Sequence, residues 1–158
     1  ICFDISEIKD DIMKFYACLV ITTWITNKYM ATQERNERYV VVDEAWNLFK
    51  NKETSDFLEN LARRARKRRV AMILATQYLS ELRKDRQAEA IVNSCDTLII
   101  LKQPIGSIDE IMKFFKLPSG ARQILTKARP GECILVRGGE VRAIKIDMTK
   151  FESKFITT

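Results

Sequence analysis

Three short apolar runs, separated by stretches of helical pattern, constrain the fold of this chain more than any other feature. The runs occupy residues 39–42, 70–74 and 97–101. Continuous apolar runs of this length are typical of strands that are buried on both faces. Strands that alternate with helices form parallel sheets joined by crossover helices. The sequence therefore predicts an α/β fold whose ligand site lies beyond the carboxyl ends of the strands.

Helical periodicity fills the segments around these runs. The longest helical pattern begins after Ser6, a suitable N-cap, and continues to about Tyr29. Shorter helices are expected over residues 55–68 and 88–92, and a further strand over residues 1–5. The apolar residues of the long helix recur every three or four positions and predict one buried face: Ile8, Ile12, Phe15, Tyr16, Leu19, Val20 and Trp24.

The pattern changes after Pro104. It predicts two short helices and then two strands, at residues 108–115, 121–125, 132–136 and 141–146. The two strands flank Gly138 and Gly139, and a type I′ hairpin turn needs positive φ at both of its central residues. We interpret the chain as one domain, with a sheet core at residues 1–103 and a helical segment plus terminal hairpin at residues 104–158.

Composition excludes several classes of protein. The chain has 158 residues, 46% of them hydrophobic, with five Gly and three Pro, which is typical of a globular domain rich in regular structure. Histidine is absent, so a His general base and His metal ligands are excluded. The longest apolar run, residues 16–25, is well short of the roughly 20 residues that a membrane span needs.

The cysteine pattern and the net charge indicate the redox compartment and the class of partner. The four cysteines form no C-x-x-C pair, which favours a reduced, cytoplasmic chain over a zinc site or a disulfide framework. The net charge of +6 favours anionic partners such as nucleotides, nucleic acid or lipid headgroups. The sequence opens with Ile1 inside an apolar segment, so we expect it to be a fragment of a longer protein.

Polar pairs follow the first two buried runs. Asp43 and Glu44 end the first, and Thr76 and Gln77 follow the second. An apolar strand that ends in Asp-Glu is the Walker B arrangement, in which the aspartate helps to hold Mg²⁺ and the next acid orients or deprotonates the attacking water. The amide of Gln77 can hydrogen-bond both the γ-phosphate and that water, as a sensor does. The alternative is that both pairs are polar caps at strand ends.

Two further features have a functional and a structural interpretation. Residues 63–69 carry six basic side chains out of seven. They could supply an arginine finger or grip nucleic acid phosphates, or they could be a solvated basic face near a helix C-terminus. Trp46 and Phe49 could stack on a base, although aromatic residues at this spacing are more often core residues.

The order of the motifs resembles the carboxy-terminal half of the large conjugation ATPases of type IV secretion systems, the TraC-like and VirB-type traffic ATPases. The matching segments are VVDEAW at 41–46, LARRARK at 61–67, ATQ at 75–77, AIVNSC at 90–95 and GECIL at 131–135. The resemblance implies a RecA-like P-loop domain that forms a hexameric ring and hydrolyses ATP with Mg²⁺ between subunits. It also implies secretion-system partners at the inner face of the cell membrane and contact with DNA.

Site residues carry over from the family by matching motif. Asp43 corresponds to the Mg²⁺-associated aspartate, and Thr76 lies beside it in the cofactor site. Glu44 corresponds to the catalytic base and Gln77 to the sensor. Arg66 is the preferred arginine acting in trans, because it matches the Arg-Lys pair of the family. Other candidates for the trans arginine or for phosphate contacts are Arg63, Lys67 and Arg68.

One element of the family is missing. No G-x-x-x-x-G-K-[ST] motif occurs in these residues, so the loop and lysine that cradle the β- and γ-phosphates are absent. We therefore expect this chain not to hydrolyse ATP by itself. Two other functions stay open: a nucleic-acid-binding module or a DNA translocase fragment of the FtsK or HerA kind, using the basic helix 63–69, and a docking domain that has lost catalysis.

Overall fold

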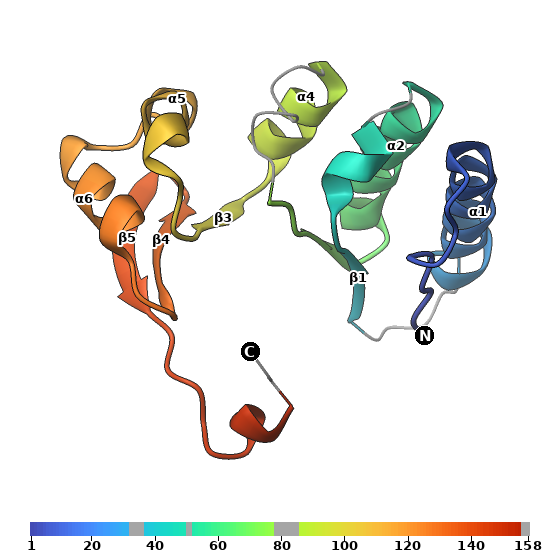
Figure 1. Ribbon diagram of the computed structural model, residues 1–158. Coiled ribbons are helices and arrows are strands. Elements are labelled where there is room, and N and C mark those ends of the chain that lie inside the picture. The colour runs from blue at the N-terminus through green and yellow to red at the C-terminus, as the bar shows by residue number, and fades with distance from the viewer. Residues whose placement is uncertain (32–36, 50–51, 78–85, 156–158) are drawn as a thin grey trace. The chain divides into compact units, whose positions relative to one another are not determined.

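The computed structural model describes residues 1–31, 37–49, 52–77 and 86–155, without the side chains of Arg66 and residues 86–88. The chain divides into two compact units, Ile1–Ser94 and Cys95–Thr158 (Figure 1). Each unit has its own strands and its own helices.

The first unit carries a parallel pair of strands. Its helices are α1 (Asp11–Trp24), α2 (Lys52–Lys67) and α4 (Arg86–Ser94), and its strands are β1 (Arg38–Val42) and β2 (Val70–Leu74). A π-helical turn, Ile25–Tyr29, extends α1, and a 3-10 helix, Ala45–Phe49, follows β1. The two strands pair in parallel, from Arg38 opposite Val70 to Val42 opposite Leu74. The predicted βαβ connection is confirmed, because α2 runs from β1 to β2 (Figure 1).

One face of this strand pair packs on the helices of the unit, and no described helix of the unit packs on the strand residues of the other face. The core of the unit gathers alternate strand residues with the apolar side of α2 and with α4: Val40, Val70, Leu58, Leu61, Ala65 and Ile91. The intervening strand residues Tyr39, Val41 and Ile73 are 57%, 65% and 49% exposed in the structure. The expectation that residues 39–42 and 70–74 are buried on both faces is therefore not met, because the described helices of this unit pack on one face of the pair.

Arg38 ties three segments of the unit together. Its side chain is buried, and its guanidinium lies over the Tyr29 ring, with the central carbon 5.7 Å from the ring centroid. The same group donates to the backbone oxygen of Tyr29 and, over 3.1 Å, to that of Arg68 at the end of α2. A cation at a helix C-terminus is also favoured by the helix dipole.

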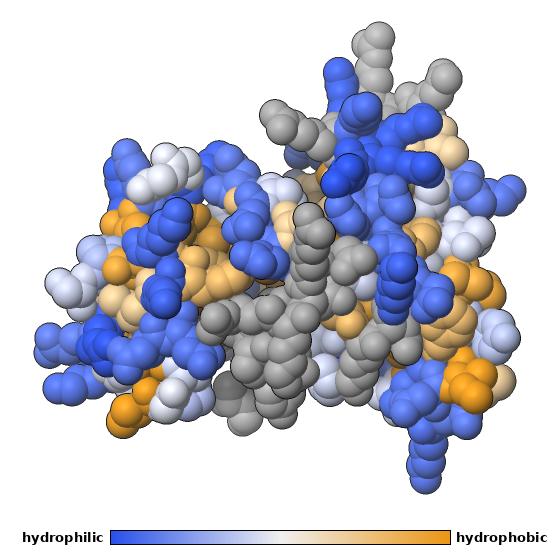
Figure 2. All heavy atoms as spheres, turned by 90° about the horizontal axis from the view of Figure 1, so that it is seen from above, coloured by the Kyte–Doolittle hydropathy of each residue, from blue (hydrophilic) through white to orange (hydrophobic). Residues whose placement is uncertain are grey.

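The amino-terminal predictions need correction. Residues 1–5 do not form a strand, since they pair with none of the described strands. The long helix begins later than expected, because Asp10 and not Ser6 is the N-cap and accepts the Met13 N–H at 2.8 Å. The predicted buried face of α1 is largely wrong, since much of its apolar stripe is exposed: Ile12, Tyr16, Leu19 and Val20. Figure 2 shows hydrophobic residues, in orange, at the surface on the right of the view, the side on which α1 lies in Figure 1.

The second unit is an antiparallel sheet with two helices. Its strands are β3 (Thr97–Ile100), β4 (Glu132–Arg137) and β5 (Glu140–Lys145), and its helices are α5 (Ile108–Phe114) and α6 (Ser119–Lys127). The strand order is β3-β4-β5, with antiparallel pairing throughout. The core of the unit packs both helices on the sheet, with Ile108, Ile111, Leu125, Cys133 and Ile134 fully buried.

One prediction for this unit is confirmed and another is not. The hairpin is confirmed, with φ of 56° at Gly138 and 84° at Gly139. The expectation that residues 97–101 form another parallel strand is not met, because the described partner of β3 is β4 in antiparallel pairing. An apolar run does not specify strand direction, since parallel and antiparallel strands can both carry continuous apolar residues.

Candidate active site

The carboxyl ends of β1 and β2 bring the two predicted polar pairs together. The backbone ladder continues past the strands, because Ala75 N–H donates to Val42 O and Ala45 N–H donates to Ala75 O, each over 2.9 Å. These bonds place the segment 43–45 directly beside the segment 75–77. Parallel pairing in register therefore assembles one polar cluster from residues 33 positions apart in the sequence.

Glu44 has a strained backbone at this point. Its φ is 48°, in the left-handed region that residues with a side chain rarely adopt. That conformation costs roughly 1–2 kcal/mol for an L-residue and persists only where the surroundings hold it. The Glu44 N–H donates to Asp43 Oδ1 over 2.9 Å, and the Glu44 carbonyl accepts the Asn47 N–H over 2.9 Å. The turn thus leads the chain from β1 straight into the 3-10 helix Ala45–Phe49.

Two N–H donors hold the Glu44 carboxylate. The Gln77 amide donates from Nε2 to Oε1 over 2.8 Å, and the Trp46 indole donates from Nε1 to Oε2 over 2.5 Å. Glu44 and Trp46 are half-buried, and Gln77 is exposed. The sequence singled out the pairing partners Glu44 and Gln77 but assigned Trp46 no polar role. The sequence could have suggested such a role, since the indole N–H is a hydrogen-bond donor that usually finds a partner when it is removed from water.

Asp43 and Thr76 flank this pair. The Asp43 carboxylate is exposed at the strand end, and Thr76 is half-buried. Among the described residues, no group of three or more Cys, Asp or Glu side chains could hold a metal by itself. Asp43 still fits the chemistry of Mg²⁺, which proteins commonly bind through one or two carboxylates together with water and substrate phosphates. Phe49 is buried in the core and is not placed to stack on a ligand.

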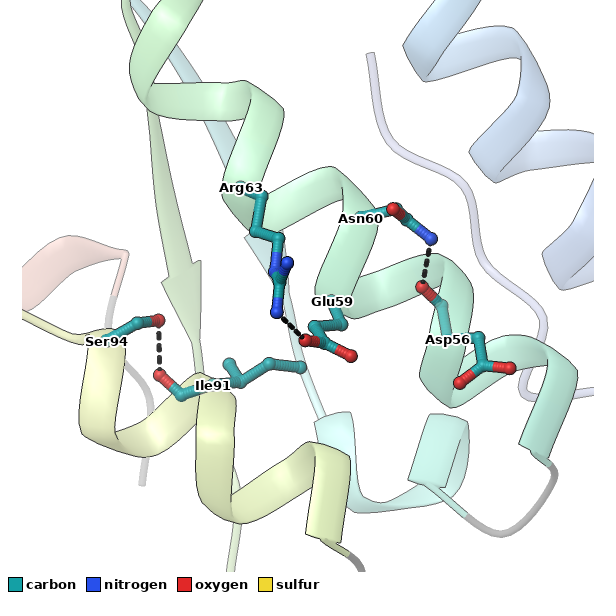
Figure 3. A network of polar contacts seen from close by, with 6 residues as sticks. All are labelled: Asp56, Glu59, Asn60, Arg63, Ile91 and Ser94. Carbon is teal, nitrogen blue, oxygen red and sulfur yellow. Dashed lines mark hydrogen bonds and ion pairs between the residues drawn. The ribbon is translucent and has the colours of Figure 1, made fainter.

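The basic stretch lies along the C-terminal half of α2 and just past its end. Arg63 extends toward Glu59, one turn earlier, and pairs with it at 2.5 Å (Figure 3). Lys67 and Arg68 are exposed. The backbone of Arg66 belongs to α2, but its side chain lies outside the described residues. The helix ends at Lys67, and Arg69, with a φ of 55°, lies beyond it and does not continue the apolar face of α2.

A family model described as an AAA-like domain matches residues 5–156. This chain belongs to that family.

This AAA-like domain is similar to one curated protein and to several solved structures. It is 26% identical over 108 residues to the type IV secretion system protein CagE of Helicobacter pylori, covering 68% of this chain and 11% of that protein. Its structure resembles VirB4 of Thermoanaerobacter pseudethanolicus with a TM-score of 0.81 and 24% identity, over 93% of this chain and 40% of that one. It also resembles B204, the DNA-packaging ATPase of Sulfolobus Turreted Icosahedral Virus, with a TM-score of 0.62 and 12% identity, over 93% of this chain and 66% of that one.

These matches confirm two of the predictions from the sequence. The α/β, RecA-like fold is confirmed by the likeness to VirB4. The resemblance to type IV secretion ATPases is confirmed by the AAA-like domain family together with CagE and VirB4. The chain spans 11% of the length of CagE and 40% of the VirB4 chain. Among the described residues of the AAA-like domain, no helix has the length and apolar character to cross a membrane.

Proposed function

We propose that this AAA-like domain is the carboxy-terminal part of the ATPase domain of a type IV secretion motor. The motor hydrolyses ATP to energise pilus biogenesis and the transfer of substrates. The observation that carries the proposal is the 2.8 Å hydrogen bond between Gln77 and Glu44, which joins the ends of two neighbouring strands. A carboxylate and an amide at this edge of the sheet can together hold and activate one water molecule.

Each residue of the cluster has a role in that chemistry. Glu44 orients the attacking water and accepts its proton, and Gln77 contacts both the water and the γ-phosphate. Asp43, with Thr76 beside it, holds Mg²⁺ through water. An Mg²⁺ ion held there would supply positive charge to offset that of the ATP phosphates. The exposure of Asp43 supports this assignment, because its carboxylate is open to water molecules and to a ligand.

The basic stretch serves the neighbouring subunit in this proposal. Arg66 acts in trans on the ATP of the next subunit in a homo-hexameric ring, with Arg63, Lys67 and Arg68 as the other candidates. Arg63 already has a partner in Glu59, so it must give up an ion pair to reach a phosphate. The exposure of Lys67 and Arg68 suits contact with a second subunit or with phosphates.

The proposal extends to the setting of the motor. The ring works in the cytoplasm, at the inner face of the cell membrane, with other components of the secretion system. The 158 residues contain no G-x-x-x-x-G-K-[ST] loop, so this chain alone does not hydrolyse ATP at a measurable rate.

Steady-state ATP hydrolysis by the full-length protein tests the proposal. Glu44→Gln is expected to reduce kcat at least a hundredfold while nucleotide binding is retained, because the amide cannot accept the proton. Glu53→Gln is the matched control, since Glu53 is an exposed glutamate at the start of α2 and its loss should leave kcat unchanged. Unchanged turnover in Glu44→Gln would make the acidic pair a structural strand end.

A second function is favoured by the exposed cations of the helix. Arg63, Arg64, Lys67, Arg68 and Arg69 are all exposed, and this basic surface could bind nucleic acid phosphates. Binding to duplex DNA would then weaken with salt, with a log–log slope of about −0.9 per neutralised phosphate. Replacing Arg64 and Lys67 by Ala should reduce the slope by about two. An affinity that does not respond to salt would exclude this function.

A further inference from the structure

Trp46 occupies a rigid turn next to the candidate base. Its neighbours in the 3-10 helix, Ala45 and Phe49, are 1% and 8% exposed and belong to the core. The helix is also held at both ends, by the bond from Ala45 N–H to Ala75 O over 2.9 Å and by the bond from Thr54 Oγ1 to Leu48 O over 2.5 Å. The backbone that carries the indole ring is therefore fixed to β2 on one side and to α2 on the other.

The two donors on the Glu44 carboxylate differ in kind. Gln77 is exposed and has both a donor and an acceptor on its amide, so it can turn toward a ligand. Trp46 is half-buried, and its indole N–H can only donate. Its bond to Oε2 is 2.5 Å long, whereas the bond from Gln77 to Oε1 is 2.8 Å. One oxygen of the carboxylate therefore has a fixed donor and the other an exchangeable one.

The strained backbone of Glu44 makes a fixed donor useful. Its φ of 48° turns the side chain out of the line of β1, toward the space shared by Trp46 and Gln77. A glutamate side chain has several freely rotating bonds, and a misplacement of about 1 Å can lower a catalytic rate about a hundredfold. A hydrogen bond from a rigid ring to an ionised acceptor is strong and directional, so it restricts those rotations.

We propose that Trp46 is a positioning residue for ATP hydrolysis, holding Oε2 of Glu44 so that Oε1 is the oxygen that accepts a proton. This inference rests on the proposed function. When the Gln77 amide turns to the water and the γ-phosphate, Oε1 faces the water. An O–H bond of the water breaks and its proton moves to Oε1. The water oxygen bonds to the γ-phosphorus, and the bond to the bridging oxygen breaks, giving ADP and phosphate.

Removal of the indole N–H tests the proposal in the full-length protein. Trp46→Phe keeps an aromatic ring but removes the donor, and it is expected to lower kcat roughly ten- to a hundredfold with KM for ATP unchanged. Trp24→Phe is the matched control, because Trp24 packs on Phe3 and takes no part in the site. Its kcat should equal that of the wild type.

A double substitution separates positioning from structural support. In a Glu44→Gln background, Trp46→Phe should cause no further loss of kcat, because the residue acts only through the Glu44 carboxylate. A structural role would instead lower kcat again and lower Tm in both backgrounds. If Glu44→Gln abolishes turnover while Trp46→Phe leaves kcat unchanged, the positioning role is wrong and the proposed function stands. If Glu44→Gln leaves turnover intact, the proposed function itself fails.

A second replacement keeps the proposal testable if Trp46→Phe does not fold. Benzothienylalanine incorporated at position 46 has the shape of tryptophan with sulfur in place of the N–H. It should reproduce the loss of kcat with the wild-type Tm. Wild-type kcat with benzothienylalanine would overturn the proposal.

Discussion

Two turns in this molecule use positive φ for different purposes. At the hairpin between β4 and β5, Gly138 and Gly139 have φ of 56° and 84°. At the end of β1, Glu44 has a φ of 48°. The hairpin uses the residue that adopts this conformation without strain, whereas β1 keeps a residue that is strained by it.

The difference indicates what each turn contributes. Nothing lies within 4 Å of where a Cβ would stand on Gly138 or Gly139, so glycine is needed there for its backbone alone. At Glu44 the side chain makes the two bonds that define the candidate site, from Gln77 and Trp46. Strain is present at the turn whose side chain accepts these hydrogen bonds, and it is absent from the turn that only reverses the chain.

The largest effect is expected at a third glycine. Gly131 precedes β4 with a φ of 85°, and a Cβ there would stand 2.4 Å from the backbone oxygen of Ile146. Gly131→Ala should lower the free energy of unfolding by about 3 kcal/mol, because the clash adds to the backbone strain. Urea denaturation of the purified protein measures this. A loss below about 1 kcal/mol would show that the backbone at Ile146 shifts away easily.

A smaller loss is expected in the hairpin turn. Gly139→Ala places a side chain on a residue with φ of 84° but in open space. The free energy of unfolding should fall by about 1–2 kcal/mol from strain alone. The same urea experiment gives the value, with Gly120→Ala in α6 as the control, since no contact lies within 4 Å there and alanine favours helix. A loss of unfolding free energy equal to that of Gly131→Ala would show that the steric clash at Gly131 adds nothing to the backbone strain.

At Glu44, where the native residue is strained, glycine is expected to be the more stable replacement and alanine the less stable one. Glu44→Gly should be more stable than Glu44→Ala by about 1 kcal/mol, because both lose the hydrogen bonds but only glycine relieves the φ of 48°. Thermal unfolding of the two variants gives the comparison, and both should lack ATP turnover in the full-length protein. Equal stability of the two variants would mean that Glu44 is not strained.

The smallest effect is expected at the first residue of the hairpin turn. Gly138→Asn should change the free energy of unfolding by a few tenths of a kcal/mol at most, because Asn-Gly is a preferred type I′ pair. Its φ of 56° lies in the left-handed region that asparagine tolerates. A loss as large as that of Gly139→Ala would show that this position needs more than a tolerant backbone.

The fold was predictable where one pattern has one structural solution. The apolar run at residues 70–74 coincides with β2, and the glycine pair predicts the hairpin. Direction and partner were not predictable for β3, because a buried run fits parallel and antiparallel sheets alike. The buried side of α1 was also misjudged, since its apolar residues nearly surround the helix and periodicity alone does not select one side.

The candidate site was predictable in part for similar reasons. Asp43, Glu44 and Gln77 follow apolar strands, and parallel pairing brings such residues to one edge of the sheet. The hydrogen bond from Trp46 to Glu44 was not predictable, because it depends on the φ of Glu44, and the hydrophobic pattern that places Trp46 beside the core says nothing of its N–H. Side-chain direction at a turn is set by backbone angles that the sequence pattern does not reveal.

The bond from Arg38 to the Arg68 backbone oxygen also fixes the length of α2. Adding one residue to this helix would rotate its end by about 100° and move it about 1.5 Å, taking the Arg68 carbonyl away from the guanidinium. Insertions and deletions within α2 should therefore be rare among related sequences, and length variation should collect in the loops.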